Sequence, residues 1–448
     1  MVKLNVNPSK ITGKIKAMNG VGQPPIEGIS CRHLHFLKEA FIPYSRLHDV
    51  GGAFGGNIFV DIPNIFRDFS ADENDPASYD FKFTDILING LIEVDCMPIF
   101  RLGVSIENYH YIQAYRIFPP DNYEKWARIC AQIIRHYCEG WADGFHHNIV
   151  YWEIWNEPDF EPLPEKNQMW LGTAEEFYTL YSITATYLKR CFGNSIKVGG
   201  YGSCGFYGIF ADPKKYAIDA DPRNDAWTTD VSHVYHIDFF HGFLRHLQKT
   251  NAPLDFFSWH TYCTVQDAEL IADYIDQVLI QYGFGNVETM LNEWNPTPGK
   301  ALLGSTEACA NAAAMMCAMQ NKKTDILCYY DARMRAGAFG GLFNAITEQP
   351  YSTYYAFMAF GEMRMLEHQL ECSLEGEMPG LYAVASGNCK NRIIMIVNIS
   401  GEDAELATNL DPTMSVYLID NNHLYTKSKY KADGFVLRAN QVAVIKDV

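Results

Sequence analysis

The sequence reads Tyr151-Trp152-Glu153-Ile154-Trp155-Asn156-Glu157-Pro158 at the point that decides the fold. An apolar, aromatic run of strand length ends there in an Asn-Glu-Pro triplet, and the proline ends the strand. Side chains alternate along a strand, so we expect Glu153, Trp155 and Glu157 to share one face. In a barrel that face is the interior. A carboxyl group held there beside apolar rings is expected to have a raised pKa, as a general acid requires.

A second stretch of the same kind reads Leu291-Asn292-Glu293-Trp294-Asn295-Pro296. It delivers Glu293 at the C-terminal end of another predicted strand. Two carboxylates that converge on one pocket from two strands are the arrangement that glycoside hydrolysis requires. One of them protonates the leaving oxygen while the other attacks the anomeric carbon, and their separation decides between retention and inversion.

Short apolar runs alternate with amphipathic helices along residues 13–355. A helix is predicted from Tyr123 to Tyr137, Thr173 begins a capping box, and Ser305 caps the helix Thr306–Gln320. The predicted strands are Ile15–Met18, Ile42–His48, Met97–Leu102, Ile149–Trp155, Ile196–Tyr201, Asp255–His260, Val287–Asn292 and Asp325–Tyr330. Eight strands that alternate with helices predict an α/β protein with a (β/α)8 TIM barrel. A doubly wound open sheet is the alternative, but the glycine fingerprint of that fold is missing from the sequence.

Three long connections follow predicted strands, at residues 51–80, 103–122 and 202–229. In a barrel such connections lie at the C-terminal face, where active sites are built. They favour a closed pocket and therefore exo action on a substrate.

The pattern changes after residue 355. The runs Leu381–Ala385, Arg392–Ile399, Met414–Ile419 and Phe435–Ile445 are short, β-type and separated by turn residues. They predict an appended β-sandwich over residues 356–448, to which residues 1–12 are a candidate extra strand.

Composition and charge exclude several classes of partner. The chain has 36 basic and 53 acidic residues and a formal charge of −17, which disfavours binding to nucleic acid. No apolar run reaches the roughly 20 residues that span a bilayer, so no membrane partner is predicted. The first residues lack the features of a signal peptide, which favours a cytoplasmic protein as written and leaves export open if the terminus is processed.

No metal or other cofactor is predicted. The twelve cysteines form no CxxC pair, and no Cys/His group has the spacing of a zinc site. His233, His236, His241 and His246 cluster in one predicted helix, but their spacing does not gather ligands on one face. They are interpreted as packed or solvated residues.

The ordered set of motifs resembles clan A of the glycoside hydrolases, and within it family 39, the family of β-xylosidases and α-L-iduronidases. The resemblance extends from about Arg46 to Phe360. Besides the two glutamate stretches it includes Tyr44-Ser45-Arg46-Leu47-His48, Lys197-Val198-Gly199-Gly200, Ser258-Trp259-His260-Thr261-Tyr262 and Phe339-Gly340-Gly341-Leu342.

The resemblance implies a role for each of the two glutamates. Glu157 would be the acid/base and Glu293 the nucleophile of a retaining, exo-acting, β-xylosidase-like enzyme. Its partner would be an oligosaccharide or glycoside substrate, and the family also suggests a homo-oligomer.

Further residues take their expected roles from the same resemblance. Asn156 would bind the sugar 2-hydroxyl, His48 and His260 would bind the glycone, and Tyr262 would contact the nucleophile. Arg46 would either hold Glu293 ionised or pair with Glu153, which is itself interpreted as a structural residue; the two alternatives stay open.

The sequence departs from the family at strand eight, where it reads Cys328-Tyr329-Tyr330-Asp331-Ala332-Arg333-Met334-Arg335. The β-xylosidases have a tryptophan there, and Tyr330 is the candidate replacement for its ring. One hypothesis is that Arg333 or Arg335 binds a uronate carboxylate. The glycone therefore stays open among xylosyl, α-L-arabinosyl, β-glucosyl and uronyl groups. A non-catalytic carbohydrate-binding barrel is a third alternative, although the presence of both glutamates argues against it.

Overall fold

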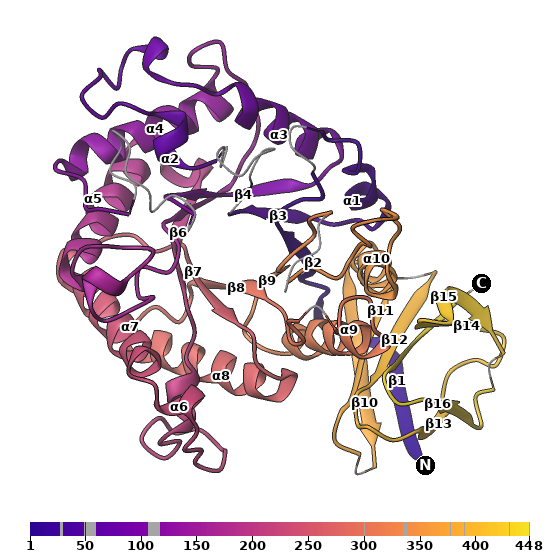
Figure 1. Cartoon of the computed structure of the whole chain (residues 1–448). Helices are drawn as coiled ribbons and strands as arrows, with labels where there is room; N and C mark the ends of the chain where they lie inside the picture. The colour runs from indigo at the N-terminus through magenta and orange to yellow at the C-terminus, as the bar shows by residue number, and fades with distance from the viewer. Residues whose placement is uncertain are drawn as a thin grey trace.

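The structure is a computed structural model of the chain, and it describes residues 1–26, 30–48, 50, 60–105, 117–299, 301–334, 339–376, 378–388, 390–429 and 431–447. It contains a closed barrel of eight parallel strands ringed by helices, and beside it a nine-stranded sheet (Figure 1). The predicted fold class is confirmed.

The barrel strands follow the order of the chain around the barrel. They are β2 (Ala17–Gly22), β3 (Tyr44–Leu47), β4 (Met97–Leu102), β5 (Tyr151–Ile154), β6 (Lys197–Ser203), β7 (Phe256–Thr261), β8 (Glu288–Trp294) and β9 (Ile326–Tyr329). The first strand begins and ends later than the predicted Ile15–Met18. Its continuation beyond the predicted end contains Gly20. A Cβ atom at Gly20 would lie 2.3 Å from the carbonyl oxygen of Leu327, so the close approach of β9 requires glycine inside this strand.

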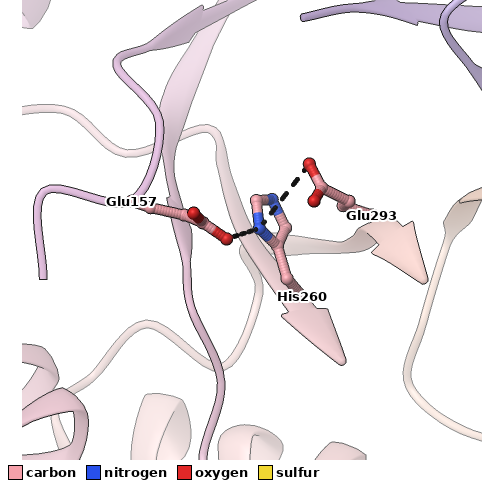
Figure 2. Close-up of side chains that lie close together, drawn as sticks. All are labelled: Glu157, His260 and Glu293. Carbon is pink, nitrogen blue, oxygen red and sulfur yellow. Dashed lines mark hydrogen bonds and ion pairs between the residues drawn. The ribbon is translucent and has the colours of Figure 1, made fainter. Parts of the chain in front are cut away.

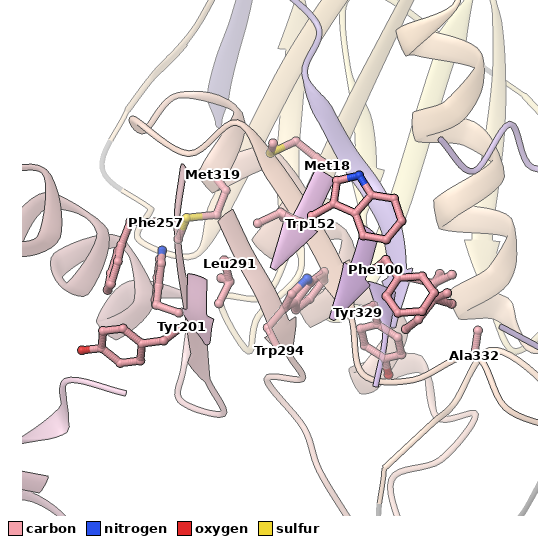
Figure 3. Packing of buried hydrophobic residues seen from close by; sticks show 14 of the residues in the cluster. Met18, Phe100, Trp152, Tyr201, Phe257, Leu291, Trp294, Met319, Tyr329 and Ala332 are labelled. Carbon is pink, nitrogen blue, oxygen red and sulfur yellow. The ribbon is translucent and has the colours of Figure 1, made fainter. Parts of the chain in front are cut away.

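The helices pack around the outside of the barrel. They are α1 (His35–Glu39), α2 (Ile62–Ile65), α3 (Lys82–Glu93), α4 (Tyr123–Glu139), α5 (Ala174–Phe192), α6 (Ala226–Thr229), α7 (Val231–Thr250), α8 (Val265–Gln281), α9 (Thr306–Gln320) and α10 (Ser352–Arg364). The capping box at Thr173 and the Ser305 cap both form as predicted. Figure 3 shows how outward-facing barrel residues such as Phe100, Trp152 and Phe257 pack in the core between strands and helices.

The barrel interior changes from apolar to polar along its axis. A layer of buried apolar side chains fills one part of the interior: Ile99, Tyr151, Phe256, Met290, Ile326 and Cys328. Two residues further along β5 and β7, the inward positions are Glu153 and Ser258, which are also fully buried. The apolar layer closes the barrel below the polar one, so the polar side chains lie toward the carboxyl ends of the strands.

The second domain is a single sheet that folds into two layers. Its strands are β1 (Val2–Lys14), β10 (His368–Glu375), β11 (Leu381–Gly387), β12 (Arg392–Asn398), β13 (Ala404–Thr408), β14 (Ser415–Asp420), β15 (His423–Ser428), β16 (Phe435–Leu437) and β17 (Gln441–Lys446). One face of β12, with Met395, belongs to the core shared with the barrel helices. The other face, with Ile394, packs in a separate core with residues of β1, β13 and β16.

Residues near both ends of the chain contribute to this sheet, as the position of the two termini in Figure 1 shows. β1 pairs antiparallel with β10 and parallel with β13. The predicted run Phe435–Ile445 is two strands, because Asn440 adopts a positive φ and breaks it. The strands β10, β13 and β15 were not predicted. The domain limits stay a prediction; residue 355 lies within α10, which packs between the barrel and the sheet.

Among the described residues, no helix is long and apolar enough to cross a membrane. The eleven cysteines in the same ranges are free thiols.

Candidate active site

Arg46 stands at the centre of the polar layer. It lies in β3 and is 1% exposed. Its Nε donates to Glu153 Oε2 at 2.7 Å, its Nη1 to Glu293 Oε2 at 3.1 Å, and its Nη2 to Asn156 Oδ1 at 2.6 Å. Arg46 therefore makes both of the contacts that the sequence left open, one with Glu153 and one with Glu293. One guanidinium group holds three side chains from β5, β8 and the turn after β5.

Glu153 is a buried anchor for this guanidinium. Its Oε1 accepts hydrogen bonds from Ser258 Oγ at 2.6 Å and from Asn292 Nδ2 at 2.7 Å. Burial raises the pKa of Glu153, but Arg46 together with these donors outweighs it and holds the pKa below its usual value. Glu153 is thus an ionised structural residue, as the sequence suggested.

A register shift brings Glu293 into the site. The pairing of β7 with β8 is irregular between Trp259 and His260, so His260 lies opposite Glu293. A bulge of this kind changes the direction of a side chain, and here the consecutive residues Asn292 and Glu293 both contact interior groups. A strictly alternating strand would have placed one of them outside the barrel.

Glu293 is 7% exposed and is held by two donors. Tyr262 Oη donates to its Oε1 at 2.5 Å, and Arg46 donates to its Oε2. Burial raises the pKa of Glu293, and Glu157 raises it further, while His260, Arg46 and Tyr262 oppose the rise. Burial and the carboxylate also raise the pKa of Tyr262, which therefore stays a neutral hydrogen-bond donor.

Glu157 reaches the same point from the turn after β5 (Figure 2). Its Oε1 lies 2.7 Å from His260 Nδ1, and the same nitrogen is 3.9 Å from Glu293 Oε2. Burial lowers the pKa of His260 to about 4 against the opposing effect of Glu293, so the imidazole is neutral near neutral pH. The contact with Glu157 is then a hydrogen bond in which one of the two groups carries the shared proton.

One expectation about the first stretch was wrong. Trp155 does not share the inner face with Glu153; its ring packs against Trp126 at 5.9 Å and Trp170 at 5.1 Å, on the helical side. The strand ends at Ile154, and Trp155 and Glu157 have φ values of 73° and 47°. These left-handed residues turn the chain, so the alternation of a strand no longer applies.

Asn156, His48 and Tyr330 lie around this centre. Asn156 is 1% exposed, and among the described residues its Nδ2 has no hydrogen-bond partner. His48 follows β3 and is buried. Tyr330 is buried beside Tyr262 and Phe339, with ring centroids 6.4 and 5.2 Å away.

The charge of Arg333 is compensated by a neighbour. Its Nε donates to Asp331 Oδ2 at 2.6 Å, and its guanidinium lies 5.6 Å from the centre of the Tyr330 ring. Asp331 is 2% exposed. Arg335, the other arginine in the uronate hypothesis, lies outside the described residues.

Several residues of the site were missed at the sequence level. Ser258 and Asn292 bind Glu153, and Asp159, two residues after Glu157, is fully buried. Ser258 could have been found, because it is inward by alternation with Phe256 and His260. Asn292 depends on the bulge and Asp159 on the turn, for which the sequence has no comparable pattern.

The described residues include one group with the donors to hold a metal ion, namely Glu157, His260 and Glu293, whose ligand atoms lie within 4.8 Å of one another. A cation bound there would compete with the Arg46 guanidinium for Glu293. The same atoms can instead act on a substrate as a proton donor and a nucleophile.

The fold and the site define a (β/α)8 barrel protein with two opposed carboxyl groups at the carboxyl ends of its strands. The sequence model of the glycosyl hydrolases family 39 matches residues 55–301. The chain therefore belongs to glycosyl hydrolase family 39, as its motifs suggested.

Individual relatives agree with this membership. A β-xylosidase of Caldicellulosiruptor saccharolyticus is 27% identical over 203 residues, which are 43% of this chain and 33% of the relative. The chain thus spans about a third of the length of this curated relative. A glucosidase structure from Croceicoccus marinus has a TM-score of 0.75 at 19% identity and covers 100% of this chain and 98% of its own. A family 39 β-xylosidase structure from Caulobacter crescentus has a TM-score of 0.68 at 15% identity, with 99% of each chain covered. At these identities the two structures show the fold.

Proposed function

We propose that the protein is a retaining glycosidase that removes terminal β-xylosyl or closely related groups from oligosaccharides or glycosides. Glu157 is its acid/base and Glu293 its nucleophile. The proposal rests first on the convergence of these two carboxyl groups at the carboxyl ends of β5 and β8.

The separation of the carboxyl groups favours retention. An oxygen of Glu157 and an oxygen of Glu293 lie within 4.8 Å of each other. Retaining enzymes have their carboxyl groups about 5–5.5 Å apart, whereas inverting enzymes leave about 6.5–9.5 Å for a water molecule. The close approach of these two oxygens is nearer to the spacing of retaining enzymes and supports the proposal of retention.

In the first step Glu157 gives its proton to the glycosidic oxygen while Glu293 attacks the anomeric carbon. Arg46 and Tyr262 orient the attacking carboxylate and favour its ionised form, although burial opposes it. The bond to the leaving group breaks, and a covalent glycosyl-enzyme forms on Glu293.

In the second step Glu157, now ionised, takes a proton from water, which attacks the same carbon and releases the sugar. His260 remains neutral and holds Glu157 through Nδ1. The unpartnered amide nitrogen of Asn156 is a donor for the sugar 2-hydroxyl. His48, His260 and Tyr330 are proposed to line the glycone site.

The substrate class follows from the family and from strand eight. The curated relative is named a β-xylosidase, and a neutral sugar fits a site in which Arg333 is already paired with Asp331. A uronate would have to displace that buried carboxylate, which disfavours the uronyl alternative at Arg333.

The test is hydrolysis of 4-nitrophenyl β-xyloside, β-glucoside, α-L-arabinosides and β-glucuronide, with proton NMR of the first sugar released. Retention of the anomeric configuration and loss of activity in Glu293→Ala are expected. Glu157→Ala should keep activity on activated substrates when azide is added, because azide attacks the glycosyl-enzyme without a general base.

Glu288→Gln is the matched control, since Glu288 lies at the other end of β8 and pairs with Lys197. An inverted product would contradict the retaining mechanism. Full activity of Glu293→Ala would contradict the nucleophile assignment.

A further inference from the structure

Asp159 is a buried carboxyl group that the proposed mechanism does not use. It lies two residues after Glu157 and is 0% exposed. A buried carboxyl group this close to an acid/base needs a physical explanation, because burial without compensation is costly.

The hydrogen bonds of Asp159 join it to residues at the C-terminal end of β6. Its Oδ2 accepts a hydrogen bond from Ser203 Oγ at 2.6 Å, and its Oδ1 accepts one from the backbone N–H of Cys204 at 3.2 Å. The backbone N–H of Glu157 donates to the carbonyl oxygen of Gly202 at 2.9 Å. The turn that carries Glu157 is therefore fastened to one strand end at two points, by its own backbone and by Asp159.

This fastening matters because the turn is not a regular element. Glu157 has a positive φ of 47°, which a non-glycine residue rarely adopts unless its surroundings hold it. Asp159 shares this task with the Glu157 N–H and with Asn167, whose Nδ2 donates to the Pro158 carbonyl oxygen at 2.9 Å.

The surroundings of Asp159 also tie its charge to that of Glu157. Burial raises the pKa of Asp159 to about 7, Ser203 and the Cys204 N–H oppose the rise, and Glu157 adds to it. The other titratable groups that sense Asp159 are Tyr201 and Cys204 of the β6 end, Tyr178 of α5 and Tyr235 of α7. Among the described residues no cationic side chain forms an ion pair with Asp159.

We propose that Asp159 is a positioning residue that holds the Glu157 carboxyl group in place for proton transfer to the leaving group. The inference rests on the proposed function of Glu157. Asp159 itself contacts neither substrate nor the reacting atoms; it acts through the turn and through its charge.

Asp159→Asn tests this role by leaving-group dependence. A misplaced acid penalises a leaving group that needs a proton and spares one that does not. We expect kcat/KM for phenyl β-xyloside to fall about tenfold, and kcat/KM for 2,4-dinitrophenyl β-xyloside to change less than about twofold. The pH profile for the phenyl glycoside should also lose an ionisation near neutral pH. Equal losses on both substrates would indicate a merely structural residue and overturn the proposal.

The matched control is Asp255→Asn. Asp255 also joins two barrel strands, accepting from the Val198 N–H at 2.8 Å and Lys189 Nζ at 2.9 Å, but at the start of β7. The Asp255→Asn variant should leave the ratio of the kcat/KM values for the two substrates unchanged.

Hydrogen exchange decides the question independently of activity. The Phe160 N–H donates to the Glu157 carbonyl oxygen at 3.1 Å within the same turn. In Asp159→Asn the amides of Glu157 and Phe160 should exchange about tenfold faster than in the unchanged protein, and in Asp255→Asn they should not. If the unchanged protein hydrolyses neither xyloside, the proposed function fails and the exchange result alone judges the positioning role. Unchanged exchange at both amides would overturn it.

Discussion

Replacement of Glu153 by Gln should destabilise the barrel by about 3 kcal/mol. Glu153 is fully buried and accepts hydrogen bonds from Arg46, Ser258 and Asn292 at 2.6–2.7 Å. The single side-chain oxygen of glutamine can accept from Ser258 and Asn292, but its NH2 group then faces Arg46 Nε. Two hydrogen-bond donors, the amide NH2 and the guanidinium N–H, would then oppose each other. Removing one partner of a buried ion pair costs about 3–5 kcal/mol. Arg46 keeps Glu293 as a second partner, which favours the lower limit.

The assay is urea unfolding followed by tryptophan fluorescence, which reports the barrel because Trp152, Trp259 and Trp294 are buried in it. Glu288→Gln is the control: Glu288 and Lys197 are about one-third exposed, and such a pair contributes less than about 1 kcal/mol. A loss in Glu153→Gln no larger than in the control would refute the reasoning that the buried charge of Glu153 holds Arg46.

Three further predictions concern single residues. Tyr262→Phe removes a hydrogen bond that lowers the pKa of Glu293, so the acidic limb of the kcat/KM profile should move to higher pH; an unmoved limb would contradict this. Asn156→Ala should lower kcat/KM by about 10- to 100-fold on a β-xyloside and far less on its 2-deoxy analogue, and equal losses would exclude a contact with the 2-hydroxyl. Burial lowers the pKa of His236 to about 3, whereas its value in the unfolded chain is about 6.5. Between these two values only the unfolded chain takes up the proton, so the stability of the protein decreases as the pH is lowered. In His236→Leu the loss of unfolding free energy between pH 6 and pH 4 should be about 2.5 kcal/mol smaller, and equal losses in both proteins would count against a neutral His236.

The barrel could be predicted from the sequence because its signals are local. Apolar runs of strand length, helix caps such as Thr173 and the order of the two glutamate stretches each depend on a few neighbouring residues. The first strand was misplaced because Gly20 serves a contact with β9, some 300 residues away in the chain. Among the strands of the second domain that were missed, β15 is mostly exposed and shows no alternation of apolar residues. The strand β10 does alternate, with Leu370, Cys372 and Leu374 on one side, so its pattern could have been found in the sequence.

The site was predictable only as far as regular geometry extends. The family pattern identified Glu157, Glu293 and Arg46, and the structure brings all three together. What the sequence could not provide are departures from regularity: the bulge that turns both Asn292 and Glu293 inward, and the left-handed turn that sends Trp155 outward. Both depend on pairing with strands that are distant in the sequence, and the pattern of residues along one strand does not reveal such pairing.

The different surroundings of the two carboxyl groups support their different proposed roles. Glu293 receives a hydrogen bond from the permanently charged Arg46 and another from Tyr262, and both favour its ionised form. Glu157 contacts a neutral His260 and lies beside a second buried carboxyl group, Asp159. Close carboxyl groups do not ionise independently, so a proton is retained by one member of the set after the others have lost theirs. Glu293 thus lies beside a fixed cation, while Glu157 belongs to a group that shares protons. A nucleophile and an acid/base need such different surroundings.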